Sequence, residues 1–148
     1  MNRIGYNDII KAFRDFCDKH YQVAQFVDLQ EADFQSVENK YPSVICTPIP
    51  STFGAGQLTL QFAVIFADIL IADNSNARDV YNDTLETAKD FVAYFTNNPE
   101  LDWTLADDLP IEPFFEKFDD TLAGWILTAS VTLPYSHGVC DIPMETTI

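Results

Sequence analysis

The sequence predicts an α+β domain in which an antiparallel sheet of about four or five strands carries two main helices on one face. Two segments have apolar residues at helical spacing. Several other segments, of strand length, either alternate apolar and polar residues or are apolar throughout, and most of these are joined by links short enough for hairpins. At 148 residues, with 47% hydrophobic and 21% charged residues, the chain fits one domain, 1–148, with its own core.

The first forty residues predict one helix and one short strand. Asn7 can cap the helix, whose apolar face would carry Ile9, Phe13 and Cys17. Residues 20–28 predict a short edge strand, and residues 31–39 are ambiguous, with a helical turn as one option. Tyr41-Pro42 ends this region, because the residue before a proline avoids the helical conformation.

The middle of the chain predicts two strands around a loop. The first begins at Ser43, and its pairing should weaken at Pro48 and Pro50, before a glycine-containing loop at residues 51–57. The second, residues 58–71, has apolar residues on both sides of the strand period. It therefore predicts a central strand that is buried on much of both faces.

The second half predicts a long helix and further strands. Asn76 can cap the helix, whose wide apolar stripe runs from Val80 to Phe95 and stops before Pro99. Residues 101–118, broken by prolines, predict irregular strand along a sheet edge. Residues 118–143 predict a turn and the closing strand, followed by an extended C-terminal tail at 136–148.

The charge balance limits the classes of partner. Twenty-three acidic residues against eight Lys and Arg give a formal net charge of −15, which opposes direct binding to DNA or RNA and to anionic membranes. The N-terminus lacks the pattern of a signal peptide, and no apolar stretch is long enough for a membrane span. We therefore expect a soluble protein made in a cytoplasm.

One pair of motifs suggests a metal site. Cys17 and His20 form a C-x-x-H pair, and His137 and Cys140 form an H-x-x-C pair, so that together they could hold a tetrahedral zinc ion. Cys17, however, lies on the apolar face of the first helix, where a small buried thiol needs no ligand role. A small metal- or ligand-binding domain remains the alternative function.

Catalytic motifs are weak. Adjacent carboxylates in so acidic a chain usually mark solvated turns, so a hydrolase that uses Asp119 or Asp120 has little support. Gly54 and Gly56 lack the Gly-Lys-Ser/Thr sequence that would cradle a phosphate. We assign no catalytic residue and no cofactor, and we expect no enzymatic activity.

Several segments together resemble small structural proteins of tailed bacteriophages, of the tail-terminator or tail-completion kind found in the neck. The resemblance runs from about Tyr41 onward, and no single motif in it is diagnostic. The segments that carry it are Tyr41-Pro42, Ile65-Phe66-Ala67-Asp68, Asp73-Asn74-Ser75-Asn76 with Val80, Ala123-Gly124-Trp125 and Cys140-Asp141-Ile142-Pro143.

The resemblance implies a virion protein that assembles with itself into a ring of six or twelve copies, between the portal side of the head and the tail. DNA would pass through the ring without specific binding. Asp120 and Gly124 would set the turn and a close backbone approach before the last strand. The implied assembly interface comprises Phe53, Gly54, Gly56, Tyr135, Cys140 and Pro143.

Overall fold

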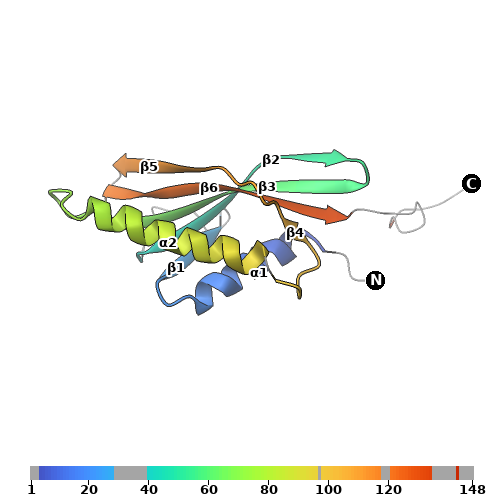
Figure 1. The fold of residues 1–148 in the computed structure, drawn as a ribbon, viewed down its shortest axis with the longest axis horizontal. Helices are drawn as coiled ribbons and strands as arrows, with labels where there is room; N and C mark the ends of the chain where they lie inside the picture. The colour runs from blue at the N-terminus through green and yellow to red at the C-terminus, as the bar shows by residue number, and fades with distance from the viewer. Residues whose placement is uncertain (1–3, 29–39, 97, 118–120, 135–142, 144–148) are drawn as a thin grey trace, which may run out of the picture.

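The computed structural model describes residues 4–28, 40–96, 98–117, 121–134 and 143 (Figure 1). They form a single α+β domain with two helices, as predicted, and with six strands where about four or five were expected. The elements are α1 (Tyr6–Lys19), β1 (Gln25–Asp28), β2 (Ser43–Gly54), β3 (Gln57–Ile69), α2 (Ala77–Thr96), β4 (Thr104–Leu105), β5 (Ile111–Lys117) and β6 (Thr121–Pro134).

The sheet is mixed rather than purely antiparallel. Its strand order is β1-β2-β3-β6-β4, and β5 also pairs with β6. The β1–β2 pair is parallel, while β2–β3, β3–β6, β4–β6 and β5–β6 are antiparallel. The prediction of purely antiparallel pairing was wrong for β1, whose long connection to β2 permits a parallel return. The edge position of β1 and the central position of β3 are confirmed.

Both helices lie on the same face of the sheet, as predicted (Figure 1). α1 begins two residues earlier than expected, because Gly5 instead of Asn7 occupies the cap and its N–H donates to Asp8 Oδ2 at 2.7 Å. Asn76 does precede α2, but its side chain binds the backbone at and just after the end of β3 instead of capping the helix. Its Oδ1 accepts from the Ile71 N–H at 3.0 Å, and its Nδ2 donates to the Ile69 carbonyl at 3.2 Å.

Aromatic side chains form the centre of the core between the helices and the sheet. The Phe13 ring lies 5.5 Å from that of Phe62, 5.0 Å from Phe91 and 5.2 Å from Phe95, measured between centroids. All four side chains are buried. Edge-on and tilted contacts of this kind add to the free energy gained by burying each ring, so this cluster fixes both helices against β3.

None of the described helices covers the opposite face of the sheet (Figure 1). On β3 the residues that face the helices, Phe62, Val64 and Phe66, are buried, whereas Ala63 and Ile65 between them are partly buried. On this outward side Ala67 is also buried, while Gln57 and Ile69 at the two strand ends are exposed, so β3 is buried on one face and only partly on the other. The outward side is polar toward the hairpin tip, with Gln57, Thr59 and Gln61, and apolar farther along the strand.

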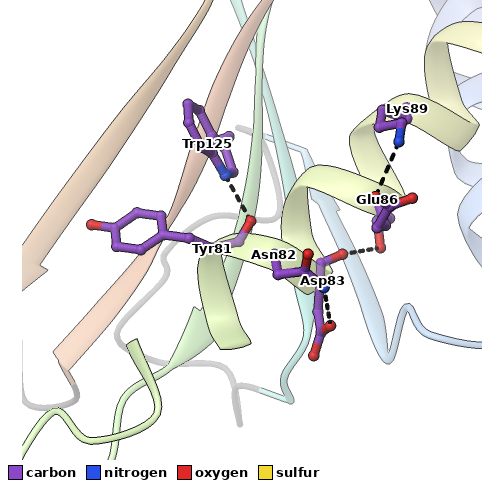
Figure 2. A network of polar contacts seen from close by, with 7 residues as sticks. Tyr81, Asn82, Asp83, Glu86, Lys89 and Trp125 are labelled. Atoms are coloured by element: carbon purple, nitrogen blue, oxygen red, sulfur yellow. Dashed lines mark hydrogen bonds and ion pairs between the residues drawn. The ribbon is translucent and has the colours of Figure 1, made fainter. Parts of the chain in front are cut away.

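β6 pairs along both edges, so it is an inner strand rather than the closing member that we expected. Gly124 lies inside it, opposite Ala67, not in a turn before it. The close backbone approach is confirmed, because a Cβ at Gly124 would lie 1.8 Å from the Phe66 carbonyl oxygen. Next to it, Trp125 Nε1 donates to the Tyr81 carbonyl oxygen at 2.9 Å and ties β6 to α2 (Figure 2).

Candidate functional site

The most distinctive surface element is a long β-hairpin, whose outer part we call the hairpin arm, residues 47–60. It comprises the second half of β2 and the beginning of β3, and it extends beyond the ends of both helices (Figure 1). β1 pairs only with Ser43–Cys46, so β2 beyond Cys46 forms an outer edge of the described sheet. The sequence predicted a loop at 51–57, and this was wrong, because the strands continue to Gly54 and resume at Gln57.

A bulge inside the arm explains why the prolines do not end the strand. The register shifts between Ile49 and Thr52, and Ser51 takes over the missing ladder contact. Its Oγ accepts from the Gln61 N–H at 3.0 Å and donates to the Ile49 carbonyl at 3.0 Å. The local hydrogen bonding is thus restored by one side chain, as is typical of a bulge that bends a strand.

Pro48 protects the open edge of the arm. The Gln61 N–H points toward β2, so the backbone groups of its ladder partner Ile49 point toward β3. Because these groups alternate in direction along a strand, the ring nitrogen of the neighbouring Pro48 points to the outer edge. Proline has no N–H to offer to an incoming strand. Pro48 therefore disfavours strand addition at this point of the edge.

The tip of the arm presents an aromatic side chain. Ala55 and Gly56 both have positive φ, 48° and 76°, as a two-residue type I′ turn requires. Phe53, just before the turn, is 68% exposed, whereas Phe62 and Phe66 farther along the hairpin are buried. Phe53, Gly54 and Gly56 of the predicted interface thus lie together at an exposed tip.

The arm carries no charge, although the chain is strongly acidic. No Asp, Glu, Lys or Arg lies between Lys40 and Asp68, while the whole chain has a formal net charge of −15. β6, the neighbour of β3 in the sheet, is also free of charged residues. A surface of this kind can approach another acidic protein without direct like-charge repulsion.

A second surface feature, which the sequence did not indicate, is a groove between α2 and the β4–β5 connection. We call it the α2 groove. Its volume is about 390 Å³, and its apolar lining includes Leu85, Ala88, Val92, Leu109, Ile111 and Leu127. The sequence holds one indirect sign of this groove: the apolar stripe of α2 is wide, and some of its residues line the groove instead of packing on the sheet.

The two described residues of the predicted metal site, Cys17 and His20, are not placed as metal ligands. Cys17 is buried in the core, and burial is the main cause that raises the pKa of its thiol to about 12. His20 has both ring nitrogens in use: Nε2 lies 2.9 Å from Asp90 Oδ2, and Nδ1 accepts from the Gln22 N–H at 3.2 Å. Among the residues with a described position, no group of three or more His, Cys, Asp or Glu could hold a metal ion.

One pocket brings two carboxylates together. Asp68 and Asp83 line a cavity of about 330 Å³ beside Thr84 and Thr87. Burial raises the pKa of Asp68, opposed by the hydrogen bond that it accepts from the Ile69 N–H and reinforced by the charge of Asp83. Two carboxylates without a further ligand or a nucleophile specify neither a metal site nor a reaction.

Of the remaining predicted site residues, only Pro143 has a described position. Asp119, Asp120, Tyr135, His137 and Cys140 lie outside the described residues, and Pro143 is described and exposed. Within the described ranges, no helix is long and apolar enough to cross a membrane. No protein-family model matches the chain, and no curated protein has a significantly similar sequence.

Proposed function

We propose that this chain is a non-enzymatic structural subunit that assembles with copies of itself into a ring in the neck or tail of a tailed bacteriophage. The observation that carries the proposal is the hairpin arm, which is long, uncharged and tipped by the 68% exposed Phe53. An exposed aromatic on a projecting hairpin costs solubility, and it is typical of residues that anchor protein interfaces.

The placement of charge supports self-assembly. Subunits that each carry a formal net charge of −15 repel one another wherever their charged surfaces meet. An uncharged arm and an uncharged β6 provide surfaces on which this repulsion is smallest. The place of the ring in a virion rests on the resemblance of the segments from Tyr41 onward to neck proteins.

The same charge gives such a ring a suitable channel. Acidic residues facing a lumen repel the phosphates of DNA and prevent adsorption, because nucleic-acid affinity depends on cations that displace counterions. The head-to-tail passage of a genome needs such a surface. We expect six or twelve copies, with portal-side and tail proteins as the neighbours above and below.

Mass measurement during size-exclusion chromatography tests the proposal, together with electron microscopy of the purified protein. We expect a discrete oligomer and ring-shaped particles, and antibody labelling at the neck of virions. A protein that stays monomeric at every concentration and is absent from virions would refute the proposal.

A further inference from the structure

We propose that the face of the sheet opposite the helices packs against the same face of a second copy of this chain, in a two-fold contact. We call this surface the outer face, and its centre consists of Ile45, Thr47, Ala63, Ile65, Ile126 and Thr128. The contact goes beyond the proposed ring, because it pairs two subunits through one shared surface and does not by itself close a ring.

The strand register places these six side chains together. Residues paired across neighbouring strands point to the same side of a sheet. Ile65 of β3 lies between Ile45 of β2 and Ile126 of β6, and in the next outward row Ala63 lies between Thr47 and Thr128. All six are only partly buried, and none of the described helices covers them (Figure 1). A surface of β-branched and small side chains is typical of sheets that pack face to face.

The centre of the outer face carries no charge. β2 and β6 contain no Asp, Glu, Lys or Arg, and Asp68, the one charged residue of β3, points to the helix side together with Phe66. Acidic residues lie only at the border, where Glu112 of β5 pairs with Ile126 and Glu116 pairs with Leu122. In a chain with a net charge of −15, this is an apolar centre with a polar rim, as in protein interfaces.

The charge pattern favours a second copy as the occupant. A basic partner gains most where carboxylates lie, and a row of isoleucines offers it no ion pair. Two copies of this chain repel each other wherever their acidic surfaces meet, so an uncharged face is where they can touch. A two-fold axis along β3 places the two β5 strands on opposite sides of the interface, so Glu112 of one copy does not face its counterpart.

The extent of the face is sufficient for a reversible contact. β3 has 13 residues and is flanked by β2 and β6. With a rise of about 3.3 Å per residue and about 4.8 Å between strands, three strands of this length cover at most roughly 600 Å². The pair of copies would bury about 1,200 Å², which is the lower end for specific interfaces. We therefore expect a dimer with a Kd in the micromolar range.

A lysine at the centre of the outer face tests the contact. Ile65→Lys places a cation there in each copy, close to the two-fold axis. It also makes the net charge one unit less negative, so a loss of association cannot come from added acidity. We expect the Kd measured by sedimentation equilibrium to rise by roughly 30-fold or more, as for a central interface residue.

Ile111→Lys is the matched control. It is the same substitution in a strand, at a residue that is 38% exposed, but Ile111 lines the α2 groove on the helix side of the sheet. It should associate like the wild type, and an equal loss in both variants would overturn the assignment to the outer face. Circular dichroism verifies folding, and if Ile65→Lys does not fold, Thr128→Lys replaces it, because Thr128 is already polar.

The salt dependence gives an independent test. Raising NaCl from about 50 to 500 mM screens the repulsion between the two acidic bodies and leaves the apolar contact, so the wild-type Kd should fall several-fold. A Kd that rises with salt would show that ion pairs hold the copies together, and it would overturn the inference.

The outcomes separate this inference from the proposed function. Wild-type rings whose mass is unchanged in Ile65→Lys overturn the outer-face contact and leave the ring proposal standing, whereas a mass that falls to half or less supports both. A wild type that forms dimers without rings, lost in Ile65→Lys, supports the contact and refutes the ring. A wild type that is monomeric at every concentration refutes both.

Discussion

Replacing Gly124 with alanine should be among the most damaging small substitutions in this protein. An added Cβ would lie 1.8 Å from the Phe66 carbonyl oxygen, 2.9 Å from the Phe66 carbonyl carbon and 3.2 Å from the Ala67 Cα. All three are backbone atoms of β3, so no flexible side chain can move aside. The β3–β6 ladder must open at the centre of the sheet.

The magnitude follows from two contributions. Forced overpacking costs roughly 1–3 kcal/mol, and the loss of about two ladder hydrogen bonds adds ~1 kcal/mol each, which gives a destabilisation of about 4 kcal/mol. For a domain of this size, that lowers the melting temperature by about 10 °C. Calorimetry and urea unfolding measure both quantities.

Two other glycines provide the controls. A Cβ at Gly54 meets nothing within 4 Å, so Gly54→Ala should change the free energy of unfolding by less than about 0.5 kcal/mol. Gly56→Ala also meets no neighbour but must adopt a φ of 76°, which costs roughly 1–2 kcal/mol. A Gly124→Ala protein as stable as Gly54→Ala would refute the reasoning.

Three further predictions concern ionisation, thiol burial and the bulge. Burial raises the pKa of Asp68 in the folded state above its ordinary value of 3.8. Protonated Asp68 therefore contributes its full stability at a pH below 3.8, and this contribution is lost as the pH rises through the folded-state pKa. Asp68→Asn should therefore gain stability over the wild type at neutral pH and lose this advantage in acid, measured by urea titration at each pH. In a Cys140→Ser background, Cys17 and Cys46, each with a pKa of about 12, should resist alkylation at pH 9.0 until denaturant is added; labelling of the native protein would contradict their burial. Ser51→Ala should destabilise the arm by about 1 kcal/mol and speed hydrogen exchange of the Gln61 amide, which donates to the Ser51 hydroxyl. An unchanged exchange rate would show that the hydroxyl does not stabilise the bulge.

The helices and inner strands were predictable because local periodicity determines them. Phe13, Phe91 and Phe95 each fall on a helical stripe, and Phe62, Val64 and Phe66 on a strand period. The parallel pairing of β1 was not predictable, because it joins residues across a long connection and no turn signal encodes it. Nor did the sequence indicate that β6 pairs on both edges.

The candidate site was predictable only in part. The exposed tip with Phe53 was anticipated, but the loop assigned around it was wrong, because prolines suggested a break that the Ser51 hydroxyl repairs. The α2 groove needs Leu109 and Leu127 beside Val92, and these residues come from three separate segments. No one-dimensional pattern reports such a juxtaposition.

The position of β6 also affects how the protein is made. Three strands, β3, β4 and β5, depend on β6 for pairing, yet β6 is the last of the described strands to leave the ribosome. Until Thr121–Pro134 has emerged, β3 lacks one of its two partners, and only β1 is left to support the hairpin. A nascent or truncated subunit therefore has a less supported arm, and in the proposed ring this would disfavour the incorporation of incomplete subunits.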